Sequence, residues 1–164
     1  MSEQAGERKV TYQLVFYSLI SLAVFFIDQL IKQKVSLLFS QGEGFPVIRN
    51  IFHITLVFNK GIAFGLFQNI PLFFLISAVI VFLFSLFRYN RPFTGEKKLA
   101  VSLISAGILS NLLDRMRLGY VVDYLDFRIW PVFNIGDASL TIGMGLLVWG
   151  VLRQKTKHKD ANRT

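Results

Sequence analysis

The sequence predicts an α-helical integral membrane protein with four transmembrane helices, a small extracytoplasmic β-sheet and a short interfacial helix. Composition supports this class, because 53% of the 164 residues are hydrophobic, 17 are Phe, and the mean hydropathy is +0.51. Long uncharged runs recur along the chain, at 11–27, 61–87, 99–113 and 138–152. A helix of about 20 residues crosses a bilayer, so runs of this length are typical of membrane spans.

The four spans are expected at about 11–31, 68–88, 99–116 and 134–152, in one membrane-embedded domain covering 1–164. External connections are then expected at 33–67 and 117–133, with a basic tail at 153–164. Eleven of the 18 Lys and Arg residues lie in 8–9, 88–98 and 153–163, which four spans place on one side. Because basic residues favour the cytoplasmic side, both termini should be cytoplasmic.

The net charge of +8 and the absence of Cys exclude several functions. Anionic membrane lipids account for the basic tail, and no clustered groove-like patch indicates a nucleic-acid partner. A chain without Cys has no disulfide and no thiol nucleophile. With only two His residues, a His-based zinc site is not expected, so we expect no metal and no cofactor.

The two external connections contain strand-like segments that should pair at the outer surface. NIFHITLVFN at 50–59 is rich in β-branched and aromatic residues, and YVVDYLDFRIW at 120–130 is the second such run. Alternation in the second run places Asp123 on one face and Asp126, as a solvated pair with Arg128, on the other. The stretch 60–68, KGIAFGLFQ, is expected to form the interfacial helix.

Several polar residues lie at one depth in the predicted spans. Asp114 and Asp137 are each 16 residues from the cytoplasmic end of their span, which corresponds to about 24 Å of helix. Asp28 reaches the same level. Asn111 lies one helical turn below Asp114, and Asn134 lies just above Asp137. Ionisable residues inside a membrane usually indicate function, although the asparagines could also serve as hydrogen bonds between helices.

Each acid also has a structural interpretation. Asp28 and Lys32 are spaced i,i+4, as in an ion pair at a helix end. Asp114 could pair with Arg115 and join the third span to the sheet. Asp137 could be the N-cap of the last span.

The available chemistry is that of carboxylates. The sequence has no G-x-S-x-G segment and no glycine-rich phosphate loop. Two carboxyl groups that share a proton can activate water and protonate a leaving amine, which is peptide hydrolysis. Cation binding and proton relay are the other uses of such a cluster.

Five motifs resemble those of the lipoprotein signal peptidase (signal peptidase II) family in order and spacing. They are DQLIK at 28–32, FNKGIAFG at 58–65, SNLLDR at 110–115, VVDYLDF at 121–127 and FNIGD at 133–137. The resemblance implies an aspartic endopeptidase of the bacterial inner membrane, with its site near the outer surface, and we expect it to be a monomer. Its partners would be membrane lipids and lipid-modified prolipoproteins, from which it removes the signal peptide just before the diacylglyceryl-modified cysteine.

The resemblance also implies roles for individual residues. Asp123 and Asp137 would be the catalytic pair. The residues expected to bind substrate or support the site are Asp28, Lys32, Asn59, Gly61, Asn111, Asp114, Arg115 and Asn134. The chain departs from the usual family pattern at Ser110, Tyr124 and Gly136, where Gly, Phe and Ala are usual.

Two alternatives remain at this point. FNIGD is one residue away from the G-x-G-D signature of other di-aspartyl membrane proteases, such as prepilin peptidases. The second alternative is a non-enzymatic membrane protein that handles protons or cations with the same acids.

Overall fold

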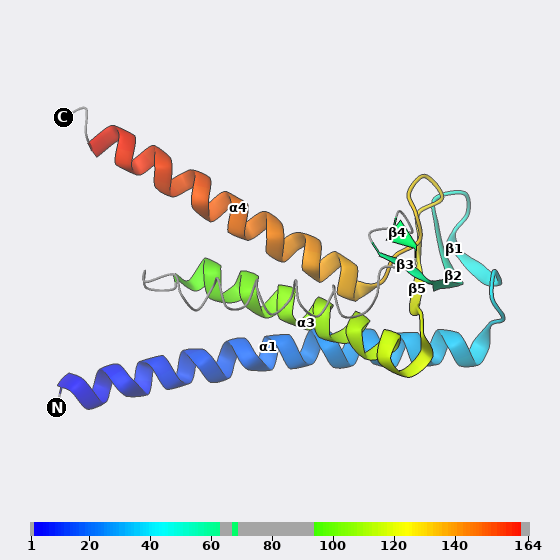
Figure 1. Ribbon diagram of the computed structural model, residues 1–164, viewed down its shortest axis with the longest axis horizontal. Coiled ribbons are helices and arrows are strands. Elements are labelled where there is room, and N and C mark those ends of the chain that lie inside the picture. The colour runs from blue at the N-terminus through cyan, green and yellow to red at the C-terminus, as the bar shows by residue number, and fades with distance from the viewer. Residues whose placement is uncertain (1, 63–66, 69–93, 162–164) are drawn as a thin grey trace.

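The computed structural model describes residues 2–62, 67–68 and 94–161, and Figure 1 shows its long helices with the strands at one end. The N- and C-termini both lie at the end of the helices opposite the strands (Figure 1). In chain order the elements are α1 (Ser2–Leu38), β1 (Gly44–Ile48), β2 (Phe52–Asn59), β3 (Gly61–Ile62), β4 (Phe67–Gln68), α3 (Gly95–Leu118), β5 (Val121–Asp126) and α4 (Ile135–Ala161).

The helices carry the apolar surface expected of membrane spans. Thr11–Leu38 of α1 and Gly95–Leu118 of α3 are long and apolar enough to cross a bilayer, and α4 has a shorter apolar stretch, Ile135–Gly150. Large apolar side chains of α1 face outward, including Phe16, 58% exposed, and Phe26, 56% exposed. The predicted span at 68–88 lies outside the described residues except for Gln68, so the count of four spans stays a prediction.

Helices α3 and α4 approach each other at a glycine. A Cβ on Gly107 of α3 would lie 2.2 Å from the carbonyl oxygen of Gly136 in α4. Helix α3 itself is capped by Thr94, which accepts from the N–H of Lys97, and ends at Gly119 with a φ of 80°. The close approach brings the C-terminal half of α3 against the first turn of α4.

The main sheet is antiparallel, with strand order β1-β2-β5. The pairing of β2 with β5 shifts by one residue, because Ile54 pairs with Leu125 whereas Val57 pairs with Asp123. Two residues of β2 therefore lie opposite the single residue Tyr124, which is a β-bulge. The shift places Asn59 on the same face of the sheet as Asp123.

Comparison with the predicted strands gives one confirmation and three corrections. NIFHITLVFN forms β2 as predicted, but β1 lies in a part of the first external connection where no strand was predicted. Strand β5 ends at Asp126 rather than continuing to 130, because Arg128 adopts a left-handed φ of 65°. Gly61–Ile62 and Phe67–Gln68 pair as strands β3 and β4, so the described ends of the predicted interfacial helix are not helical.

A small apolar cluster joins the sheet to α1. Val35 of α1 packs with Leu56 of β2 and with Val122 and Tyr124 of β5, and each is at most 5% exposed. The cluster holds β5 across the C-terminal part of α1. The chain then needs only residues 127–134 to connect the end of β5 with the start of α4.

Candidate active site

The side chain of Asn134 connects two carboxylates that lie on different elements. Asp123 lies in β5 and is 1% exposed, and Asp137 lies in the first turn of α4. Nδ2 of the fully buried Asn134 donates to Asp123 Oδ1 at 2.6 Å. Its Oδ1 accepts from the backbone N–H of Asp137 at 2.8 Å. One asparagine thus holds the strand that carries one acid against the helix that carries the other.

Asp137 belongs to the cap of α4. The carbonyl of Asn134 accepts the first intrahelical hydrogen bond, from Ala138, so Asn134 rather than Asp137 is the N-cap. The backbone N–H of Asn134 donates to Asp137 Oδ2 at 3.3 Å, which completes a reciprocal capping box. Asn111 of α3 donates from Nδ2 to Asp137 Oδ1 at 2.7 Å. Both carboxylate oxygens accept hydrogen bonds at the positive end of the helix dipole, which favours a negative charge there.

A second group of residues surrounds Asp123 from the side of β2. Asn59 donates from Nδ2 to Asp123 Oδ2 at 2.9 Å, and its Oδ1 accepts from the N–H of Gly61 at 2.9 Å. Arg115 of α3 donates from Nη2 to the carbonyl of Gly61 at 2.9 Å. The arginine therefore holds the chain after β2 beside the two carboxylates.

The three asparagines at the site share one arrangement. In each, the amide oxygen accepts from a group that can only donate. Asn59 accepts from the N–H of Gly61, and Asn134 accepts from the N–H of Asp137. Asn111 accepts from the ammonium of Lys32. Each amide nitrogen is consequently directed at a carboxylate. The site presents hydrogen-bond donors to both acids, an arrangement suited to carboxylates that carry charge during a reaction.

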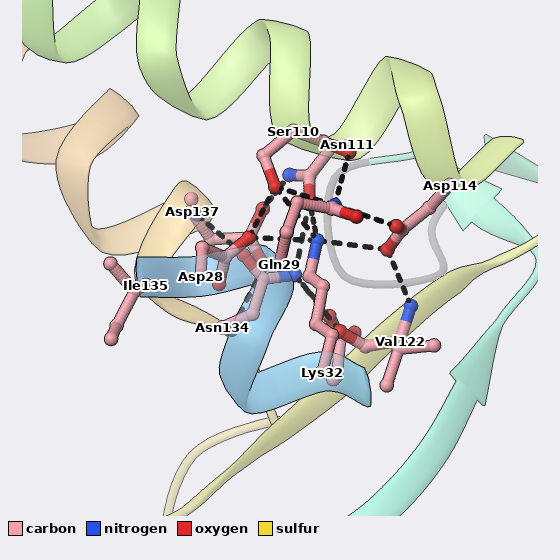
Figure 2. A network of polar contacts seen from close by, with 12 residues as sticks. Asp28, Gln29, Lys32, Ser110, Asn111, Asp114, Val122, Asn134, Ile135 and Asp137 are labelled. Carbon is pink, nitrogen blue, oxygen red and sulfur yellow. Dashed lines mark hydrogen bonds and ion pairs between the residues drawn. The ribbon is translucent and has the colours of Figure 1, made fainter. Parts of the chain in front are cut away.

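Behind the carboxylates lies a buried ionic network centred on Lys32, 3% exposed (Figure 2). Its Nζ lies 2.9 Å from Asp28 Oδ2 and 2.8 Å from Asp114 Oδ2. Asp28 also accepts from the hydroxyl of Ser110 at 2.5 Å and from that of Tyr124 at 2.9 Å. Because a buried charge without partners is strongly destabilising, this complete pairing is what allows charges at that depth.

The network tests the structural roles that the sequence suggested for Asp28 and Asp114. The i,i+4 pair of Asp28 and Lys32 is confirmed. Asp114 does connect α3 to the sheet, but it does so by accepting from the N–H of Val122 at 3.1 Å and by pairing with Lys32, not with Arg115.

Asp126 lies away from the two catalytic candidates. It pairs with Arg128 at 2.9 Å as predicted, but it is 5% exposed rather than solvated, because Thr55 and the backbone N–H of Arg128 also donate to it.

Residues that sequence reasoning did not select complete the network. Gln29 donates to Ser110 and to Asp114, and the hydroxyl of Tyr124 accepts from the N–H of Ile135 at 3.2 Å. Gln29 and Ser110 lie inside the DQLIK and SNLLDR motifs. Their polar side chains within apolar helices could have identified them as members of the network. Tyr124 gave no such signal, because alternation directs it away from Asp123.

Electrostatics distinguish Asp123 from an ordinary surface acid. Burial, followed by the nearby charge of Asp137, raises the pKa of Asp123 to about 7, although hydrogen bonds from Asn59 and Asn134 oppose the shift. Burial also raises the pKa of Tyr124, and the neighbouring Asp28 adds to this effect. A carboxyl group that can be neutral near neutral pH, beside a second carboxylate, is the arrangement needed for acid–base chemistry.

Known proteins are similar to this chain in sequence and in fold. Residues 20–153 match the family described as signal peptidase (SPase) II. The chain is 42% identical over 138 residues to a protein named lipoprotein signal peptidase from Halothermothrix orenii, covering 84% of this chain and 95% of that protein. The protein of the same name from Moorella thermoacetica is 43% identical over 138 residues, covering 83% and 92% of the two chains.

A solved bacterial membrane enzyme has the same fold, with a TM-score of 0.79 and 32% sequence identity, covering 87% of this chain and 90% of that one. A second bacterial membrane enzyme gives a TM-score of 0.73 at 33% identity. The family match spans most of the chain, including every motif that suggested the resemblance. The chain therefore belongs to the signal peptidase II family of membrane aspartyl proteases and is a bacterial membrane enzyme.

Proposed function

We propose that this protein removes the signal peptide from diacylglyceryl-modified prolipoproteins, cleaving just before the lipidated cysteine. The observation that carries the proposal is the bridge through Asn134, which brings Asp123 and Asp137 into one hydrogen-bonded unit. The relatives from Halothermothrix orenii and Moorella thermoacetica are named for lipoprotein signal peptide processing, which supports this substrate class.

In the proposed mechanism Asp137 is the ionised base and Asp123 the protonated acid. The capping box and the dipole of α4 favour a charge on Asp137, whereas the pKa of Asp123, raised to about 7 mainly by burial, favours a neutral carboxyl there. A water molecule between them loses a proton to Asp137 as its oxygen attacks the scissile carbonyl carbon. Asp123 protonates the carbonyl oxygen.

Collapse of the tetrahedral intermediate breaks the C–N bond. Asp137 then gives its proton to the leaving amine, and a hydroxyl of the intermediate returns a proton to Asp123, which restores the starting state. Asn59 and Arg115 are the candidates for holding the substrate backbone or the developing oxyanion. Asn111 and Asn134 orient the two acids.

Substrate choice should follow from the depth of the site. Both termini lie at the end of the helices opposite the sheet, and basic residues concentrate near those ends, which supports cytoplasmic termini and a site near the outer membrane surface (Figure 1). A diacylglyceryl anchor would hold the cleavage point of a precursor at this level.

The test is to offer the purified protein one precursor with and without its cysteine lipid. We expect efficient cleavage only of the lipidated form. Equal cleavage of both forms would contradict the proposed substrate class and favour a prepilin-type specificity, and cleavage of neither would favour the ion-handling alternative.

Asp123→Asn and Asp137→Asn test the two acids. Each variant should lose nearly all activity, and the double variant should be little worse, because the two residues act as a unit. Asp126→Asn is the matched control on the same strand and should keep turnover. A dead Asp126→Asn beside an active Asp123→Asn would show that the other face of β5 serves the site.

A further inference from the structure

The proposed mechanism leaves the buried ammonium of Lys32 unused. Besides its two carboxylate partners, Lys32 Nζ donates to Asn111 Oδ1 at 2.9 Å, and Asn111 is itself 7% exposed. From its other side Asn111 donates to Asp137, so Lys32 is one side chain away from the proposed base. Figure 2 shows Lys32 extending from α1 into the network between Asp114 and the amide of Asn111.

The chemistry of an ammonium group decides how the Asn111 amide is oriented. An ammonium has three donors and no acceptor, whereas an amide has a donating nitrogen and an accepting oxygen. If the Asn111 amide were turned around, its nitrogen would face Lys32 and its oxygen would face Asp137. Two donors would then oppose each other in a buried site, and Asp137 would lose a donor at 2.7 Å.

Asn134 reinforces the same orientation. Its Nδ2 donates to Asn111 Oδ1 at 3.1 Å, so the oxygen of Asn111 accepts from two sides. The Nδ2 of Asn134 is the same group that donates to Asp123. The ammonium thus begins a directed series of hydrogen bonds that ends on Asp137, while Asn134 donates both to the same Asn111 oxygen and to Asp123.

We propose that Lys32 is a positioning residue of the active site, which fixes the Asn111 amide so that its nitrogen donates to Asp137. This inference rests on the proposed function, since it assigns Asp137 a role that needs a donor on its carboxylate. Lys32 does not touch substrate in this scheme, and among the described residues its hydrogen bonds reach Asp137 only through Asn111.

The first test is a double-mutant cycle with the lipidated precursor. Lys32→Met removes the ammonium, and Asn111→Ala removes the amide. Each should lower kcat by about 10- to 100-fold with little change in KM, as is usual when a group that orients an active-site residue is lost. The double variant should be close to Asn111→Ala alone, because among the described residues Lys32 is joined to the base by hydrogen bonds only through Asn111 and otherwise acts on it by its charge alone.

Gln29→Leu is the matched control on α1. Gln29 contacts Ser110 and Asp114 in the same network, but no hydrogen bond joins it to Asn111 or Asp137 among the described residues. It should lower thermal stability and leave kcat unchanged. Wild-type kcat in Lys32→Met, or single effects that multiply in the double variant, would overturn the inference.

A second variant keeps the inference testable if Lys32→Met does not fold. Asn111→Asp retains the partner of Lys32 but places a carboxylate oxygen against Asp137. Protonating residue 111 at acid pH restores an O–H donor toward Asp137. The ratio of variant to wild-type kcat should therefore rise at least about 10-fold from pH 8 to pH 5. The charged groups around this position are Asp28 and Lys32 on α1, Asp114 and Arg115 on α3, Asp123 on β5 and Asp137 on α4.

A flat or falling ratio would mean that an oxygen of residue 111 faces Asp137 in the wild-type protein, and the inference would be wrong. Failure of the proposed function is distinguishable, because the wild-type protein itself would then not cleave the lipidated precursor. That result would overturn both proposals, whereas an active wild type with an unexpected variant ratio overturns only this one.

Discussion

Replacing Tyr124 with Phe should destabilise the protein while preserving its activity. The hydroxyl donates to Oδ1 of the fully buried Asp28 at 2.9 Å and accepts from the N–H of Ile135 at 3.2 Å. Lys32 and Ser110 both bind the other oxygen of Asp28, so Oδ1 would lose its donor among the described residues. A hydrogen bond to a charged group contributes about 1.5–3 kcal/mol, so the variant should lose about 2–3 kcal/mol.

The assay is thermal unfolding in detergent, followed by intrinsic fluorescence, together with precursor cleavage. For a chain of this size, a loss of about 2–3 kcal/mol lowers Tm by about 4 to 12 °C. Tyr120→Phe is the control, because the Tyr120 ring stacks on Phe58 and its hydroxyl makes no hydrogen bond to the described residues. An unchanged Tm would refute the reasoning. A large fall in kcat at unchanged Tm would instead show that the Tyr124 hydroxyl takes part in the reaction.

Four further results are expected. Asn134→Ala should lower kcat at least about 100-fold and the unfolding free energy by about 1 kcal/mol, measured by cleavage and thermal unfolding, because it removes a donor to Asp123 and the cap of α4. The pKa of Asp123 is raised to about 7, so the stability gained from its neutral form should be full below about pH 4 and lost as the pH rises through 7. Wild-type Tm should accordingly fall over that window relative to Asp123→Asn. Cleavage should survive excess EDTA, whereas loss of activity that Mg²⁺ restores would exclude a purely carboxylate mechanism. Single cysteines at Glu96 and Ile129 should react with impermeant reagents from opposite faces of the membrane, and labelling of both from one face would contradict the topology.

The sequence predicted which polar residues of the helices lie together better than it predicted their hydrogen-bond and ion-pair partners. Counting helical residues from the cytoplasmic ends places Asp114 and Asp137 at one depth, and the structure brings both into one hydrogen-bonded region with Lys32 and Asn111. Such counting succeeds because the rise of a helix is constant. Partner choice depends on how α1 packs on α3, which no local pattern encodes, so the pairing of Asp114 with Lys32 rather than Arg115 was not predicted.

The sheet shows a similar limit. The β-branched run at 50–59 predicted β2, whereas β1 was missed because a glycine and a proline make Gly44–Ile48 resemble a turn. The end of β5 was misplaced because alternation continues past Asp126, while the left-handed φ of Arg128 turns the chain there. Polarity alternation can thus indicate a strand, but it cannot show where hydrogen bonding to a neighbour stops.

The β-bulge in β2 lets this strand lose one residue and still align with the site. Two residues of β2 lie opposite Tyr124, so deleting Thr55 would leave one residue there, with Ile54 still opposite Leu125 and Val57 still opposite Asp123. Asn59 would then stay opposite Val121 and, because side chains alternate along a strand, on the face of Asp123. An inserted residue would have to bulge out as well, or it would turn Asn59 to the other face. The length of β2 can therefore shrink by one residue with the Asn59 amide still on the face of the site.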